Sequence, residues 1–395
     1  MAETANFQRN DARVDLPTRI FLTSDGMRLF APKPGQLKRF KNLIGVARDC
    51  LADDAYNALL VQKMVLNGCI EEVYICLPNL LQYRQSIIST NNLILFAILY
   101  KKLTPSLAEV LCQSSVVQAY NRKNPKYAIV NINAVSRVKI DTLRAEKPQL
   151  FESMENEIAD EVRAKIHRQP ISDEDKQTRI RSLDKFIAWI DHRIWYMYLI
   201  VYQTTLRQEL IKSFSDMIIT YLSRTAVATH LSSLLMEFIQ NAEKAHFERL
   251  IVRCGLAKKN EVDAFLRERV NRERAIEEAQ RVNQMLDLAW SMNPDTTSVG
   301  QQYKIGITLS NFGLITEETR MELAKKMRAD TKGIALANFY KEKDPKKEDS
   351  LGAGLGLLYN SYLEEVCQKE GIMYKCNIYP EPEKEKTTVK IELLL

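Results

Sequence analysis

The clearest pattern of apolar and polar positions lies between residues 229 and 247, where apolar residues recur at intervals of three and four. This spacing predicts an amphipathic α-helix with one buried stripe. Glu237 and Asn241 lie one helical turn apart on a second face, which Lys244 extends. The apolar stripe comprises Leu231, Leu234, Leu235, Phe238, Ile239 and Ala242.

A carboxylate beside a carboxamide on one helix face is suited to nucleotide chemistry. The amide oxygen of Asn241 can bind Mg²⁺, which prefers oxygen ligands. The carboxylate of Glu237 can orient or deprotonate a nucleophile next to a γ-phosphate. The simpler interpretation, a solvated polar face on a surface helix, remains open on this segment alone.

A glycine-rich segment lies much later, at residues 349–357, with glycines at alternate positions. Glycine allows close approach of the backbone to phosphate and positive φ angles. The pattern at residues 357–370 predicts a helix directly afterwards, so the loop opens a helix N-terminus, which favours anions. A flexible turn is the alternative, and the spacing does not fit a dinucleotide-binding fingerprint. The three glycines are Gly352, Gly354 and Gly356.

Two strands and a helix are predicted around these segments. Apolar alternation at residues 304–315 predicts a strand that includes Asn311-Phe312-Gly313 near its end. A helix is expected at residues 317–327, and a second strand at residues 387–393.

In this order the parts resemble the GHKL ATPases, a family that includes sensor histidine kinases, type II topoisomerases, Hsp90-like chaperones and MutL-like proteins. The resemblance covers residues 229–395 and is closest to histidine kinases. It implies an α/β sandwich, a mixed sheet with helices on one face, that binds ATP and Mg²⁺. The residues matching its motifs are Glu237, Asn241 and Lys244 of the N-box, Asn311 and Gly313 of the first glycine box, Gly352, Gly354, Leu355 and Gly356 of the second, and Thr387 or Thr388 on the late strand.

The resemblance also implies a division of labour among these residues. Asn241 would ligate Mg²⁺, the loop from Gly352 to Gly356 would hold the phosphates, and Glu237 would polarise the attacking group. The family's first box has an Asp that faces adenine, whereas this chain has Asn311, and Ile315 stands in place of the second Gly. An amide oxygen accepts a weaker hydrogen bond than a carboxylate, so adenine preference is expected to be reduced.

The remaining chain divides into two expected parts. Residues 1–134 are expected to form a sensory or receiver-like α/β domain with a parallel sheet. Its expected strands lie at 19–23, 72–77 and 127–132, and a helix is expected at 40–64. Residues 135–228 are expected to be helical, with one long helix or a hairpin at 172–223, and to form a homodimer. His192 in this part is a candidate phospho-acceptor, with a structural helix residue as the alternative.

Residues 255–295 are read as an insertion with one or two exposed helices between Glu261 and Trp290. This segment is rich in charge pairs at helical spacing. Its basic residues can bind phosphate or a partner, although a solvated helix is the simpler alternative. They are Arg267, Arg269, Arg272 and Arg274.

Composition narrows the class of protein without selecting a function. A net charge of +6 on 395 residues, with mixed signs, gives no clear nucleic-acid signal. No apolar run reaches the ~20 residues of a membrane span. Seven scattered cysteines and four histidines indicate neither a disulfide framework nor a zinc site. These features favour a cytoplasmic location.

Three hypotheses follow for function. The chain is a cytoplasmic signalling kinase that resembles two-component sensors, with a signalling partner, or an ATPase. Alternatively it is a degenerate GHKL-fold regulatory or scaffold protein that acts through protein contacts with little or no catalysis. In the third hypothesis it is an unrelated α/β protein, and Asn241 and Gly354 then lie far apart.

Overall fold

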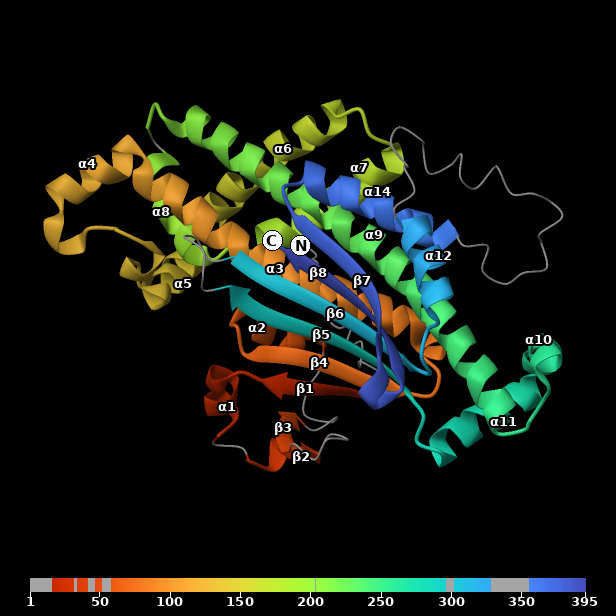
Figure 1. Cartoon of the computed structure of the whole chain (residues 1–395). Helices are drawn as coiled ribbons and strands as arrows, with labels where there is room; N and C mark the ends of the chain where they lie inside the picture. The colour runs from red at the N-terminus through yellow and green to blue at the C-terminus, as the bar shows by residue number, and fades with distance from the viewer. Residues whose placement is uncertain are drawn as a thin grey trace. The chain divides into compact units, whose positions relative to one another are not determined.

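A computed structural model of the chain gives a mixed α/β protein with one large sheet (Figure 1). The strand order within the described residues is β2-β3-β1-β4-β5-β6-β8-β7. The structure describes residues 16–31, 34–41, 47–51, 58–202, 204–295, 302–327 and 355–395.

The strands have the following bounds: β1 Thr18–Leu22, β2 Leu37–Lys41, β3 Ala47–Leu51, β4 Ile70–Leu77, β5 Leu286–Asp295, β6 Gln302–Phe312, β7 Met373–Glu381 and β8 Lys386–Leu394. The helices are α1 Ser24–Phe30, α2 Ala58–Leu66, α3 Arg84–Gln113, α4 Ser115–Lys123, α5 Arg137–Glu146, α6 Pro148–Arg168, α7 Asp173–Trp189, α8 His192–Tyr202, α9 Arg207–Arg253, α10 Val262–Arg267, α11 Arg269–Arg281, α12 Glu317–Met327 and α14 Leu355–Lys369.

The chain forms two compact units, and their boundaries differ from the expected ones. The first unit contains Met1–Ile94 together with Val227–Leu395, and the second contains Leu95–Ala226. The boundaries differ from the expected ones because β4 pairs with β5, which places Leu77 opposite Leu286. The first strands therefore extend the C-terminal sheet, whereas the sequence pattern predicts a separate domain at residues 1–134.

The direction of the strands corrects the prediction of a mixed sheet. Every pairing among the described strands is antiparallel. The expected helix at residues 40–64 is replaced by the end of β2, by β3 and by the shorter α2. The expected strand at 127–132 is also wrong, since only short 3₁₀ turns flank it at Pro125–Tyr127 and Ile132–Ala134. Short apolar runs without a clear period do not distinguish a helix from a strand.

The second unit is helical, as the pattern of residues 135–228 predicts. Its apolar core includes Phe186, Trp195, Tyr198 and Phe214, which are fully buried. The single helix considered for residues 172–223 is instead divided into α7, α8 and the start of α9. The break before α8 is stabilised by Asp191, whose Oδ1 accepts from the backbone N–H of Arg193 (2.9 Å).

In the first unit, alternate residues of the central strands are buried on one face of the sheet. Trp290 of β5 and Ile307 of β6 are buried there, and the predicted apolar stripe of α9 is buried as well, from Leu231 to Ile239. On the other face, Lys304 pairs with Glu392 at 2.7 Å. Burying one Leu or Phe side chain contributes about 1.5–3 kcal/mol, so this apolar layer positions α9.

A buried polar chain crosses the same layer. Trp290 Nε1 donates to Asn91 Oδ1 (3.1 Å), and Asn91 Nδ2 donates to Ser232 Oγ of α9 (2.8 Å). Ser232 Oγ in turn donates to Asn92 Oδ1 (3.0 Å). These bonds join β5, α3 and α9, and they fix the register of the helices on the sheet because an unpaired buried donor is costly.

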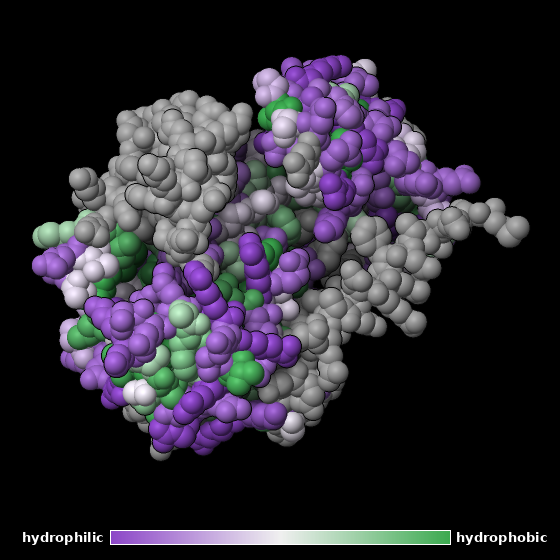
Figure 2. Space-filling view, turned by 90° about the vertical axis from the view of Figure 1, so that its right-hand side faces the viewer, coloured by the Kyte–Doolittle hydropathy of each residue, from purple (hydrophilic) through white to green (hydrophobic). Residues whose placement is uncertain are grey.

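The described surface near α10 and α11 is largely hydrophilic, with hydrophobic residues in small groups (Figure 2). This fits the mixed charge of the sequence. Among the helices that the structure describes, none has both the length and the hydrophobicity needed to cross a membrane.

Replacing Asn91 with alanine is expected to destabilise the protein by about 1–3 kcal/mol, because the Trp290 indole N–H then lies buried without an acceptor. Urea unfolding followed by circular dichroism measures the change. The exposed Asn377 of β7 supplies the matched control. Equal stability of Asn91→Ala and Asn377→Ala would contradict the role given to this bond.

Candidate functional site

The segment predicted from sequence as a separate helix is the central part of α9, a helix of 47 residues. The aromatic side of α14 lies against it. His230 Nδ1 of α9 lies 2.5 Å from the hydroxyl of Tyr359, and its ring meets that of Tyr362 edge-on, with 5.2 Å between centroids. The helix that follows the glycine-rich segment therefore packs beside the helix that carries Glu237 and Asn241.

The glycine-rich segment itself is only partly described. Gly352 and Gly354 lie outside the described residues. Leu355 and Gly356 form the first turn of α14, so the expected helix begins within the glycine motif.

The end of β6 brings three predicted residues together. Asn311 is opposite Thr387 of β8 in the antiparallel register, and paired residues point to the same face of a sheet. Thr387 Oγ1 donates to the carbonyl of Gly313 (2.7 Å). Asn311 is buried, and its Nδ2 donates to the carbonyl of Phe312 (3.3 Å).

The alternative, Thr388, points to the opposite face. Its Oγ1 donates to Glu381 Oε1 (2.5 Å) and lies 2.8 Å from Ser310 Oγ. Thr387 rather than Thr388 therefore shares a side with Asn311.

Arg249 of α9 is a site residue that the sequence reasoning missed. Its Nη1 donates to the carbonyls of Phe312 and Gly313 (both 2.9 Å), and Nη2 donates to that of Leu314 (3.2 Å). Arg249 lies seven residues after Ala242, where the helical spacing predicts the next apolar residue of the stripe. A cation at this position interrupts the stripe, and that interruption is the sequence signal that could have revealed Arg249.

Gly313 is required where Arg249 meets the strand end. Its φ of +92° is a conformation that other residues rarely adopt. A Cβ at this position would lie 2.3 Å from Arg249 Cδ. The glycine thus permits both the turn and the approach of the arginine.

Asn241 and Lys244 lie at a different opening, which we call the α9–α10 cavity. Its volume is about 350 Å³. Asn241 is exposed, whereas Glu237 is half-buried and does not line the cavity. The cavity is lined by Leu81, Gln240, Asn241, Glu243, Lys244, Phe247, Asp263, Leu266, Arg267 and Arg272.

A buried carboxylate anchors the wall of this cavity. Glu243 accepts from the backbone N–H groups of Leu80 and Leu81 (both 3.0 Å) and from Arg272 Nη2 (3.1 Å). Burial raises the pKa of the Glu243 carboxyl, while these donors act in the opposite direction. Glu243 therefore ties the turn that precedes α3 and the helix α11 to α9.

His246, the neighbour of these residues on α9, is fully buried. Neither ring nitrogen has a hydrogen-bond partner within the described structure. Burial, with a contribution from the Arg249 charge, lowers the pKa of the imidazole to about 4. The ring is therefore neutral at physiological pH.

His192 belongs to the second unit, at the start of α8. Its Nδ1 lies 2.7 Å from Asp141 Oδ1, and its side chain is 40% exposed. The imidazole is accessible and oriented by a carboxylate, which fits both a phospho-acceptor and a structural residue.

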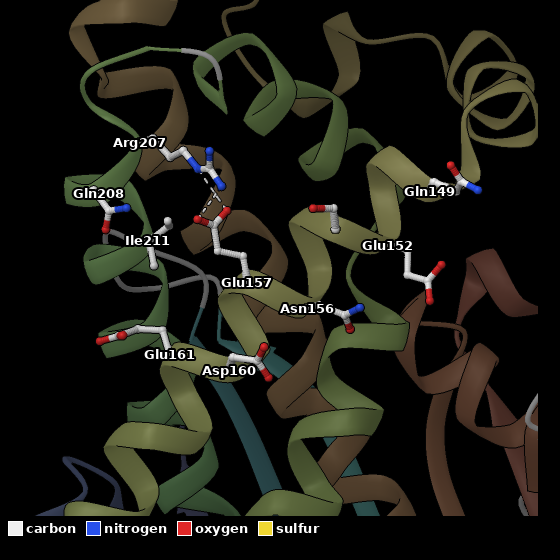
Figure 3. A pocket seen from close by; sticks show the side chains of 10 residues that line it. Gln149, Glu152, Asn156, Glu157, Asp160, Glu161, Arg207, Gln208 and Ile211 are labelled. Atoms are coloured by element: carbon white, nitrogen blue, oxygen red, sulfur yellow. Dashed lines mark hydrogen bonds and ion pairs between the residues drawn. The ribbon is translucent and has the colours of Figure 1, made fainter.

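The second unit contains a groove of about 830 Å³ along α6. Figure 3 shows its acidic side chains, with Glu157 directed at Arg207. Arg207 binds Glu157 through two bonds of 3.0 and 2.6 Å. Because Glu152, Asp160 and Glu161 add negative charge, the groove is unsuited to phosphate.

A protein-only metal centre is not found in the described part of the chain, which has no group of three or more His, Cys, Asp or Glu residues suitably placed. A metal at Asn241 would therefore depend on oxygens supplied by its ligand, as Mg²⁺ often does with phosphates.

Comparison with known proteins places the chain in a family without assigning an activity. Residues 9–395 match the model described as "Family of unknown function (DUF8084)", so the chain belongs to this family. It is 23% identical over 398 residues to an "Uncharacterized protein" of Treponema pallidum (strain Nichols), covering 96% of this chain and 97% of the relative. No solved structure matches the chain significantly.

Gly313→Ala is expected to destabilise the protein by about 1–3 kcal/mol, because alanine is strained at positive φ and its Cβ displaces Arg249. Gly35→Ala is the control, since nothing lies within 4 Å of a Cβ there. Thermal unfolding of the two variants tests the difference. A Gly313→Ala protein as stable as Gly35→Ala would show that the strand end does not need the glycine.

Stability is also expected to depend on His246 between its folded pKa of about 4 and its unfolded value of 6.5. In this window the unfolded chain binds the proton more readily, so stability falls as the pH falls. Between about pH 7.5 and about pH 5, the free energy of unfolding of His246→Leu should fall by about 2 kcal/mol less than that of the wild type.

The exposed His167 provides the control variant His167→Leu. Urea unfolding at both pH values measures each difference. Parallel pH profiles for wild type and His246→Leu would contradict a buried neutral imidazole.

Proposed function

We propose that the chain is an ATP-binding signalling protein whose first unit holds Mg-ATP in a GHKL-like site. The observation that carries this proposal is the meeting of α9 with the end of β6. There, Arg249 and Thr387 both bind the carbonyl of Gly313. The helix with the N-box pattern and the strand with the first glycine-box pattern are thus joined, although they are more than sixty residues apart in sequence.

The packing of α14 on α9 supports the same proposal. The third hypothesis of an unrelated α/β protein requires the glycine-rich segment and Asn241 to lie far apart. Tyr359 of α14 contacts His230 of α9, eleven residues before Asn241. The helix that follows the segment thus packs on the helix that bears Asn241, while Gly354 itself lies outside the described residues. The N-terminus of a helix is a suitable place for phosphate.

In this proposal each residue has a specific task. Asn241 ligates Mg²⁺, Lys244 contacts the phosphates, Asn311 faces the adenine, and Glu237 polarises the attacking group. Residues 352–356 hold the phosphates through backbone N–H groups. The nucleophile is His192 or a partner's histidine in a kinase, and water in an ATPase.

A second candidate is a regulatory protein on the same fold with weak nucleotide binding. Asn311 favours it, since a neutral amide stands where a carboxylate would accept the stronger hydrogen bond. The bond from Asn311 Nδ2 to its own backbone neighbour also engages this side chain in the protein itself.

We also propose that the helices of the second unit mediate a homodimer and that the protein is cytoplasmic. The supporting observation for the location is that all seven cysteines are free, which fits a reducing compartment.

Calorimetric titration with ATP and Mg²⁺ tests the nucleotide site. The wild type is expected to bind Mg-ATP, and Asn241→Ala is expected to bind it at least about tenfold more weakly because a metal ligand is lost. Asn311→Asp should bind about tenfold more tightly, because a charged acceptor strengthens the hydrogen bond to the adenine amino group.

Asn377→Ala and Asn377→Asp, at an exposed position of β7, control for the two chemical changes. Binding by none of the proteins at millimolar nucleotide would eliminate the ATP site. Binding that is unaffected by either substitution would locate the nucleotide elsewhere.

A further inference from the structure

The α9–α10 cavity contains more positive charge than its internal ion pairs neutralise. Arg272 is paired with the buried Glu243, and Lys244 lies 4.0 Å from Asp263. Arg267 is exposed at the end of α10 and makes no ion pair within the described structure. Its guanidinium is therefore the cation of the cavity that remains available to a ligand.

The residues from α10 and α11 are held on α9 by a small apolar core of their own. Phe247, Leu250 and Ile251 of α9 are buried against Val262 of α10 and against Ala275 and Ala279 of α11. Figure 1 shows these two short helices beside the C-terminal end of α9. This core, with the Arg272–Glu243 pair, holds Arg267 on the same cavity as Asn241 and Lys244.

The chemistry of the cavity fits a phosphate group. Asn241 supplies an amide oxygen for a cation, while Lys244 and Arg267 supply donors for anionic oxygens. Guanidinium groups bind phosphate through two parallel hydrogen bonds and remain charged at any physiological pH. The phosphate end of a nucleotide requires this combination of donors and a cation ligand.

We propose that Arg267 binds the terminal phosphate of the Mg-bound nucleoside triphosphate, so that the α10–α11 segment is part of the nucleotide site. This inference rests on the proposed ATP-binding function and adds to it a residue that distinguishes a triphosphate from a diphosphate. The surface helices of the segment thereby acquire a role in detecting the nucleotide state.

The test is calorimetric titration of the full chain with ATP, ADP and inorganic phosphate, each with Mg²⁺. Arg267→Gln is expected to weaken ATP binding about tenfold, the loss of one charge-assisted contact. Its ADP affinity should change less than about twofold, since ADP lacks the phosphate that Arg267 contacts. Arg269→Gln, with the same charge change two residues away on an exposed position, should match the wild type for both nucleotides.

Each outcome decides the proposal. Equal losses of ATP and ADP affinity, or no loss of either, would overturn the role of Arg267. The ATP site would remain supported if Asn241→Ala still weakened ATP binding. If Arg267→Gln weakens the binding of inorganic phosphate but leaves the affinity for ATP unchanged, Arg267 belongs to a separate anion site. This result would also overturn the proposal. Failure of the wild type to bind ATP would remove the proposed function and this inference together.

Discussion

Burial of α9 against one face of the antiparallel sheet is the constraint on which the first unit depends. The apolar stripe from Leu231 to Ala242 loses its contact with water there, and this burial is the dominant favourable contribution to folding. Within the same layer, Asn91, Ser232 and Trp290 satisfy one another's polar groups. The apolar contacts hold the helix on the sheet, and the polar bonds determine where along the sheet it rests.

Fixing α9 in this way determines the environment of its polar residues. Arg249 reaches three carbonyls at the end of β6, which join the helix to the strand carrying Asn311. Glu243 binds the turn that precedes α3 and Arg272 of α11, so a second side of the helix is anchored as well. Between these anchored residues Asn241 is exposed and Lys244 is half-buried, so both can be reached by a ligand. Stable anchors around accessible polar groups reduce the entropic cost of binding.

The sequence by itself determined the elements that have a strong period or a clear boundary. The stripe of residues 229–247, the helix at 317–327 and the alternating strand at 304–315 are present as α9, α12 and β6 because their side chains repeat with the period of one structure. Residues 135–228 are helical for the same reason. The weaker patterns at 40–64 and 127–132 were misread, and Leu286 and Leu288 were attributed to a helix although they begin β5. A short apolar run fits either a strand or a buried helix, and only its neighbours decide.

Tertiary structure alone decided how these elements combine. Pairing of β4 with β5 joins segments about two hundred residues apart, and no local pattern encodes such a contact. The register of β6 with β8 places Thr387, and not Thr388, on the same face as Asn311, since adjacent strand residues point to opposite faces. The surroundings of Arg249 and Arg267 arise in the same way. Folding brings α9 to the end of β6, where Arg249 binds three carbonyls, and α10 to the side of α9, where Arg267 lines a cavity. The chemistry of a charge depends on the groups around it, so the sequence alone could not assign either contact.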